Sequence, residues 1–334
     1  MKHSFEPAWW LRNPHLQTIY PAIFRKNIFL ERVRERLITP DQDFLDLDWY
    51  EESDKPLVIL LHGLSGSSES GYILGLQQAL RDCGFASVAL NFRGCSGTPN
   101  WKARCYHSGE TEDIAFVYDT LRQRFPDRSF AAVGFSLGGN VLLKWLGEQG
   151  SAVSLFAAVA VSVPLVLSEC ASRLDKGFSR IYRRYLLDEL KQYIGLKLAL
   201  LQNQGFYDEA DRLRELGDLS DIRSFWQYDQ RVVARLHGFR DASDYYHRSS
   251  SRQFIGAIRV PTLLIQAHDD PFMTPAVLPN SQELAPQVTM EIQPWGGHVG
   301  FVHTQKQHGK TYWLDKRIPA YLSSKLDSGI HSEV

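Results

Sequence analysis

The stretch AAVGFSLGGN, from Ala131 to Asn140, sets a serine between two glycines where an apolar run meets a helical pattern. The run ends at Ser136 without polar alternation, which predicts a strand buried on both faces. A sharp strand-to-helix turn leaves no room for a Cβ atom on either side of the serine, which explains Gly134 and Gly138 and would point Oγ over the sheet edge. The pattern alone leaves two interpretations open: a nucleophile, or an inert serine in a glycine-rich connection.

Short apolar runs alternate with helical patterns along the first half of the chain, as a mostly parallel sheet flanked by helices requires. The predicted buried strands are Pro56 to Gly63, Phe85 to Gly94, Ser129 to Ser136 and Leu155 to Pro164. The predicted helices are Ser70 to Arg81, Glu112 to Arg124 and Gly138 to Gln149. An antiparallel hairpin is predicted before them, at Glu35 to Glu51.

The pattern changes at about Leu165, where charged and aromatic residues with helical periodicity continue to Gln253. Strand patterns return at Val260 to Pro271 and Gln287 to His298, which predicts one α/β core carrying a helical lid insertion. We therefore expect a single domain over 1–334, with an N-terminal extension of about 1–33, core segments of about 34–164 and 254–325, and the lid at about 165–253. An apolar helix face in the lid is predicted to pack on the core and in part to line an acyl-chain groove: Phe178, Tyr182, Tyr185, Leu186, Leu190 and Tyr193.

The composition excludes several classes of protein. With 44% hydrophobic residues, 22% charged residues and a net charge of −1, the chain reads as a globular protein with no affinity for nucleic acid. The four cysteines form no CxxC pair, which favours a reducing, cytoplasmic compartment. We find no signal peptide pattern and no run of about 18 apolar residues. No cofactor is expected.

A serine hydroxyl needs a base to accept its proton and a carboxylate to orient that base. His298 follows a predicted strand within WGGHVGF, whose glycines permit a tight loop. Asp270 lies just after another strand and before Pro271, with Asp269 as its rival one residue away. A metal site at His268 to Asp270 is disfavoured, because adjacent side chains on an extended segment point to alternate sides.

Two backbone N–H groups are candidates for an oxyanion hole, those of Leu64 and Leu137. Leu64 follows the strand that ends in His62 and Gly63, and His62 is expected to anchor the loop. Arg93 is expected to anchor the neighbouring loop NFRGCSG. The N-terminal segment WWLRNPHLQTIYPAIF lacks a clean amphipathic stripe, so we expect it to pack on the fold, with no indication of peripheral membrane contact.

The chain resembles the YheT-like branch of the α/β-hydrolases over nearly its whole length. The resemblance rests on NPHLQTI (13–19), HGLSGSSES followed by Tyr72, NFRGCSG (91–97), GFSLGGN (134–140), DDP (269–271) and GGHVGF (296–301). The order serine, aspartate, histidine is that of α/β-hydrolases. The family's triad carries over onto Ser136, Asp270 and His298. Eukaryotic relatives usually carry an N-terminal membrane anchor, which we do not find in this sequence.

These observations predict a serine hydrolase that cleaves carboxylic esters, with lipid or medium-chain acyl esters as small-molecule substrates. The resemblance implies glycerolipid esters among the substrates of the family, and ester synthesis by some fungal members. An acyltransferase that uses the same triad and passes the acyl group to an alcohol is therefore the first alternative. A non-catalytic binding protein on a hydrolase scaffold is the second.

Overall fold

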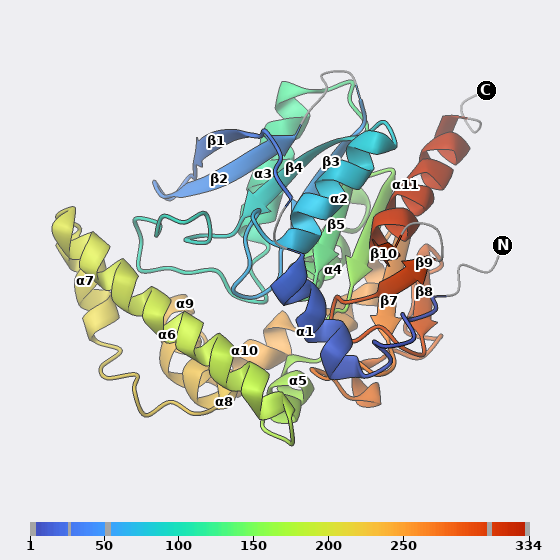
Figure 1. The fold of residues 1–334 in the computed structure, drawn as a ribbon. Helices are drawn as coiled ribbons and strands as arrows, with labels where there is room; N and C mark the ends of the chain where they lie inside the picture. Colours follow the sequence, from blue (N-terminus) through green and yellow to red (C-terminus); the bar gives the residue numbers. More distant parts are fainter. Residues whose placement is uncertain (1–4, 26–27, 51–54, 306–308, 331–334) are drawn as a thin grey trace.

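The computed structural model describes residues 5–25, 28–50, 55–305 and 309–330. At its centre is an eight-stranded sheet in the order β1-β2-β4-β3-β5-β6-β7-β8 (Figure 1). The strands are β1 (Val33–Ile38), β2 (Phe44–Tyr50), β3 (Leu57–Leu61), β4 (Ala86–Asn91), β5 (Phe130–Phe135), β6 (Ala157–Val161), β7 (Thr262–Ala267) and β8 (Val288–Gln293). Strands β3 to β8 run parallel, and β1 and β2 are antiparallel. The predicted fold class is confirmed, and the hairpin lies where it was expected.

Helices cover both faces of the sheet, which is why its central strands are apolar throughout. In β3, Leu57 and Ile59 face one hydrophobic core and Val58 and Leu60 the other. The first core is closed by α3 (Glu112–Arg124) and α4 (Leu137–Gln149), and the second by α2 (Gly71–Asp82) and α11 (Leu314–Ile330). Residues that alternate between two buried faces leave no polar position in the strand, as the continuous apolar runs predicted.

The segment between β6 and β7 is mainly helical and gathers at one end of the sheet (Figure 1). It comprises α5 (Leu167–Leu174), α6 (Ser179–Asn203), α7 (Tyr207–Arg214), α8 (Phe225–Tyr228), the π-helical turn η2 (Asp229–Val233), α9 (Ala234–His237), α10 (Ala242–Ser249) and the 3-10 helix η3 (Ser251–Ala257). Helices α5 to α10 share a hydrophobic core of their own, whereas Ile255 of η3 packs in the first core of the sheet. The division of the chain into extension, core and lid stays a prediction.

The apolar stripe predicted for the lid lies on α6 and its N-cap, but it is only partly buried. Tyr182 and Leu190 are buried, whereas Phe178 and Tyr185 are exposed. These two side chains do not belong to the part of the stripe that packs on the core, and Tyr185 lines a cavity instead. The buried face of α6 passes through Leu187 and Ile194, since it is turned toward α5 and α7.

The remaining elements are an N-terminal helix, two short 3-10 helices and a small strand pair. Near the N-terminus is α1 (Pro14–Phe24), whose N-cap Asn13 accepts hydrogen bonds from the N–H groups of His15 and Leu16. Two short 3-10 helices, η1 (Gly150–Ala152) and η4 (Pro275–Val277), and a small antiparallel pair, β9 (Val302–Gln305) and β10 (Gly309–Tyr312), complete the fold. Among the described residues no helix is long and apolar enough to cross a bilayer.

Arg93 anchors the loop after β4, as the sequence predicted. Its guanidinium contacts Asp113 at 2.8 Å, Asp43 at 3.0 Å and Asp41 at 2.8 Å, and the side chains of Arg93, Asp43 and Asp113 are all at least 98% buried. Removing one partner of a buried ion cluster leaves the others charged and without compensation.

We therefore expect Arg93→Ala to lower the free energy of unfolding by about 3–5 kcal/mol, because Asp43 and Asp113 lose their counter-charge. Urea unfolding followed by circular dichroism measures this change. Arg184→Ala is the control, since Arg184 is 85% exposed and its removal should change stability by about 0.5 kcal/mol or less. Equal stability of the two variants would contradict the anchoring role.

Candidate active site

Ser136 occupies a strained turn between β5 and α4. Its φ of 50° and ψ of −118° lie in a region that residues other than glycine rarely adopt. A Cβ atom on Gly138 would lie 2.4 Å from the carbonyl oxygen of His62, and one on Gly134 would lie 2.4 Å from the carbonyl oxygen of Gly138. The two glycines are therefore required by backbone contact, for the reason that the sequence suggested.

The structure brings Ser136, His298 and Asp270 into one hydrogen-bonded chain. His298 Nε2 lies 2.9 Å from Ser136 Oγ, and His298 Nδ1 lies 2.8 Å from Asp270 Oδ2. Asp270 is buried, and its Oδ1 accepts a hydrogen bond from the N–H of Phe272 at 2.8 Å. The Phe272 ring stacks on the imidazole at 4.1 Å between centroids, which restricts rotation of the imidazole. This arrangement suits proton transfer from the serine hydroxyl.

Asp269, the rival acid, contacts the histidine loop through the backbone instead. Its Oδ1 accepts a hydrogen bond from the N–H of Gly297 at 3.0 Å. Burial, together with the nearby Asp270 charge, raises the pKa of Asp269 above its ordinary value. Of the two carboxylates, Asp270 is the one placed against the imidazole of His298.

Helix α1 holds the loop that carries His298, a contact between the two ends of the chain that sequence reasoning missed. Thr18 Oγ accepts a hydrogen bond from the N–H of His298 at 2.9 Å. The amide of Gln17 accepts from the N–H of Val302 at 2.7 Å and donates to its carbonyl at 3.0 Å. A Cβ atom on Gly297 would lie 2.6 Å from the carbonyl oxygen of Pro14. The motif NPHLQTI was the available signal, since it contains the cap, Gln17 and Thr18.

The loop after β3 approaches Ser136 from the other side. A Cβ atom on Gly63 would lie 3.2 Å from Ser136 Cβ, so Leu64 is adjacent to the nucleophile turn. In the described part of the chain, no residue accepts a hydrogen bond from the N–H of Leu64 or Leu137, and both residues line the same cavity as Ser136. Two N–H donors are thus available beside the serine.

His62 anchors this loop. One ring nitrogen, Nδ1, donates to the carbonyl of Gly63 at 2.8 Å, and Nε2 accepts from the N–H of Phe92 at 3.2 Å. Burial lowers the pKa of His62 to about 4, so the ring is neutral at pH 7 and can make both contacts.

A cavity of about 760 Å³ opens at Ser136 and His298 and is bounded mainly by apolar side chains. One wall comes from α1 and another from α6, where Tyr185, Leu186, Leu190 and Tyr193 contribute. The predicted acyl-chain lining thus includes four of the six stripe residues. A cavity of this volume holds a ligand of drug or lipid-monoester size.

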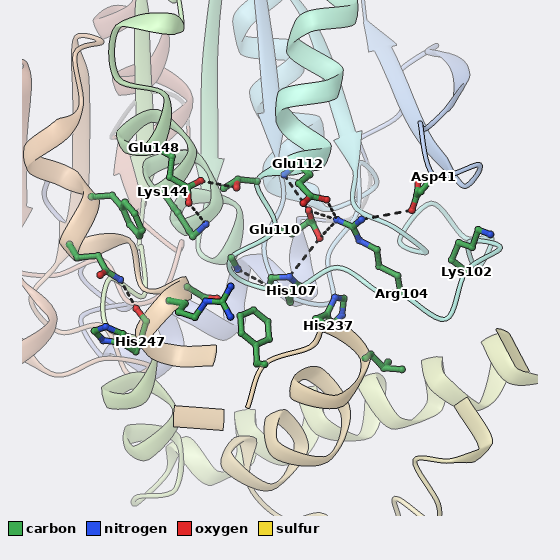
Figure 2. Close-up of a pocket in the computed structure, with 18 of the residues that line it drawn as sticks. Asp41, Lys102, Arg104, His107, Glu110, Glu112, Lys144, Glu148, His237 and His247 are labelled. Atoms are coloured by element: carbon green, nitrogen blue, oxygen red, sulfur yellow. Dashed lines mark hydrogen bonds and ion pairs between the residues drawn. The ribbon is translucent and has the colours of Figure 1, made fainter. Parts of the chain in front are cut away.

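Figure 2 shows a second pocket, of about 880 Å³. His107, Leu236 and His237 line both this pocket and the cavity at Ser136. Ser136 and His298 do not line the second pocket. Its charged residues are largely engaged with one another, for example Arg104 with Glu110 and Lys144 with Glu148.

Three of its residues, His107, Glu110 and His237, have potential ligand atoms within 4.8 Å of one another, but their hydrogen bonds do not suit a metal ion. The Nδ1 atom of His107 accepts from the N–H of Gly109 at 3.1 Å, so a neutral ring carries its proton on Nε2. Both oxygens of Glu110 accept from Arg104 at 2.8 Å. We assign no metal to this cluster.

The parallel sheet, the strained serine turn and the serine–histidine–aspartate chain together define an α/β-hydrolase. Residues 56–303 match the family model for the alpha/beta hydrolase fold, and the chain belongs to this family, in its YheT-like branch. YheT of Escherichia coli (strain K12), a predicted esterase by name, is 41% identical over 97% of this chain and 94% of its own. The predicted family is confirmed, and with it the class of ester hydrolase.

More distant relatives carry lipase names. Phospholipase ABHD3 of Mus musculus is 26% identical over 98% of this chain and 80% of its own. Monoacylglycerol lipase of Saccharomyces cerevisiae (strain ATCC 204508 / S288c) is 31% identical over 79% of this chain and 58% of its own. Among solved structures, the esterase Pf2001 of Pyrococcus furiosus aligns with a TM-score of 0.57 at 18% identity, covering 90% of this chain and 93% of its own, which supports the fold alone.

We expect Thr18→Val to lower kcat for ester hydrolysis about tenfold with little change in KM, because His298 loses a hydrogen bond that positions its backbone. Steady-state kinetics on a soluble p-nitrophenyl ester measures kcat and KM separately. Thr18→Ser is the matched control, since it keeps the hydroxyl and should restore most of the rate. A rate for Thr18→Val equal to wild type would show that the contact does not position the histidine.

The two aspartates should differ sharply in the same assay. Asp270→Asn should lower kcat by about 10³- to 10⁴-fold, because the amide cannot stabilise the imidazolium or hold the required tautomer. Asp269→Asn keeps an oxygen for the Gly297 N–H and should cost about tenfold or less. The reverse order of effects would make Asp269 the orienting acid.

Proposed function

We propose that this protein is a serine esterase that hydrolyses carboxylic esters of apolar, lipid-like acyl groups through Ser136, His298 and Asp270. The observation that carries the proposal is the hydrogen-bonded chain from Ser136 Oγ through His298 to Asp270, which opens into an apolar cavity. Membership of a family with esterase and lipase names supports the same reaction class.

In the first half of the reaction, Ser136 Oγ attacks the carbonyl carbon of the ester while His298 Nε2 takes its proton. The carbonyl electrons move onto oxygen, which the N–H groups of Leu64 and Leu137 stabilise, each worth about 3 kcal/mol in the transition state. The intermediate then collapses, the ester C–O bond breaks, and His298 gives its proton to the departing alcohol. An acyl ester of Ser136 remains.

In the second half, water replaces the alcohol. His298 removes a proton from water as the oxygen attacks the acyl carbon, and the same oxyanion hole binds the second intermediate. The bond to Ser136 Oγ breaks, the serine recovers its proton from His298, and the acid is released. Asp270 orients the imidazole and stabilises its positive charge throughout, and no cofactor takes part.

The acyl group is assigned to the apolar part of the cavity, where Leu186 and Leu190 of α6 lie opposite the core. The names monoacylglycerol lipase and phospholipase among the relatives support a lipid-derived ester as substrate. The described cysteines Cys83, Cys95, Cys105 and Cys170 are free thiols, which supports a reducing compartment such as the cytoplasm.

The first experiment is labelling of the purified protein with a fluorophosphonate, followed by peptide mapping and by hydrolysis of p-nitrophenyl esters from acetyl to palmitoyl. We expect label on Ser136 and an optimum at intermediate or long acyl chains. Ser136→Ala should lose the label and at least about 10³-fold in kcat. Ser281→Ala, which changes an exposed serine that does not line the cavity, is the control.

Product analysis with added alcohol then identifies the acyl acceptor. Free acid as the main product supports hydrolysis, and a new ester as the main product would replace the proposal with the acyltransferase. Ester turnover that survives in Ser136→Ala would contradict the nucleophile assignment.

A further inference from the structure

The wall of the cavity opposite the core carries a buried carboxylate. Along α8, η2 and α9, residues spaced three or four apart face the cavity, and most are apolar or aromatic: Phe225, Tyr228, Asp229, Val232, Val233, Leu236 and His237. Burial lowers the pKa of His237 well below its ordinary value, so this imidazole is neutral at pH 7. Asp229, the first residue of the π-helical turn, is the one carboxylate among them. Such turns are costly in a helix and occur frequently at functional sites.

Among the residues that the structure describes, no positively charged side chain pairs with Asp229. The residue is 7% exposed, and its one hydrogen bond within the described chain is the one that Oδ2 accepts from the Tyr246 hydroxyl at 2.6 Å. The other side chains on the cavity wall that carry full charge are already paired, Arg25 with Asp315 and Glu69 with Arg32. Burial raises the pKa of Asp229 to about 7, although the Tyr246 hydrogen bond opposes this rise. Burying a carboxylate without a counter-charge is unfavourable, so the position calls for an explanation.

A purely structural role explains only part of the geometry. The Asp229–Tyr246 hydrogen bond does connect η2 to α10. A tyrosine hydroxyl, however, needs one neutral acceptor, which Asn would supply without the cost of burying an ionisable group. The second oxygen, Oδ1, bonds to no other described residue, and Asp229 lines the cavity.

Aromatic rings surround this carboxylate. Tyr228, Tyr245 and Tyr246 all line the cavity, and the rings of Tyr245 and Tyr246 lie 5.3 Å apart. Trp226 packs edge-on against Tyr246 at 4.7 Å from behind. Aromatic rings close to a carboxylate form an environment that attracts an organic cation, since the ring quadrupole and the negative charge both favour it.

We propose that Asp229, with Tyr228, Tyr245 and Tyr246, binds an alkylammonium group of the substrate, so that the enzyme prefers esters that carry a positive charge at the end remote from the ester bond. The predicted substrate preference rests on the proposed esterase function, because it requires turnover. Binding of the ammonium group itself does not depend on Ser136. Binding of the cation supplies the counter-charge that the free protein lacks.

The test compares esters that differ only in charge. One pair is butyrylcholine and 3,3-dimethylbutyl butyrate, and the other is ethyl 4-(trimethylammonio)butyrate and ethyl 5,5-dimethylhexanoate. In each pair a quaternary nitrogen is replaced by carbon of the same shape. We expect wild-type kcat/KM to favour the cation about tenfold or more in at least one pair, in keeping with a desolvated cation–π contact plus a charge pair. No preference for the cation in either pair would overturn the proposal.

Asp229→Asn tests the carboxylate itself, because it keeps an acceptor for Tyr246 and removes the charge. The ratio of kcat/KM values within the favoured pair should fall close to one. Asp188→Asn is the matched control, since Asp188 is an exposed residue of α6 outside the cavity, and its ratio should equal that of wild type. A ratio unchanged by Asp229→Asn would assign the preference to another group and overturn the proposal.

Binding to Ser136→Ala protein separates this proposal from the esterase assignment. Calorimetric titration with butyrylcholine and with ethyl 4-(trimethylammonio)butyrate, each against its neutral partner, reports the ammonium site without turnover. Tighter binding of a cation with no hydrolysis by the wild type would refute the esterase and support the site. Hydrolysis of the neutral esters with no tighter binding of either cation would refute the site and leave the esterase standing.

Discussion

Backbone contact at the carboxyl end of β5 is the constraint on which the rest of the site depends. Helix α4 starts so close to the end of β3 that a single Cβ atom on Gly138 would meet the His62 carbonyl at 2.4 Å. This closeness holds Ser136 at a positive φ and places the Leu64 loop beside it. The two apolar cores on either side of the sheet stabilise the strained turn, since the turn cannot relax without separating α4 from the sheet.

The base and the acid reach the serine from other parts of the chain. Asp270 follows β7 and His298 follows β8, so both lie at the same edge of the parallel sheet as Ser136. The long loop after β8 has little regular structure to support it, and α1 supplies that support through Gln17 and Thr18. The N-terminal segment therefore helps to position the site, although Thr18 and His298 are 280 residues apart in the sequence.

The sheet and the inserted helices contribute different parts of the site. Strand ends and their loops hold Ser136, Asp270 and His298, whereas α6 and the α8–α9 segment line part of the apolar cavity beside them. Fold alone does not define a substrate, because the same catalytic arrangement serves many esters. The carboxylate of Asp229, within a mainly apolar wall, is the feature through which this insertion would impose a chemical preference.

The sequence by itself predicted the sheet, the helices around it and the candidate residues Ser136, Asp270 and His298. It could do so because buried strands require continuous apolar runs and the sharp turn requires glycines, and both are local properties of a sequence. It did not separate Asp269 from Asp270 with certainty, did not say which stripe residues of α6 would be buried, and gave no reason for Thr18 or Asp229. Those outcomes depended on contacts between distant segments: the loop direction after β7, the rotation of α6 toward α5 and α7, and the packing of α1 and η2 around the cavity. Only tertiary structure decides such contacts, since no local pattern records which distant residue will lie opposite.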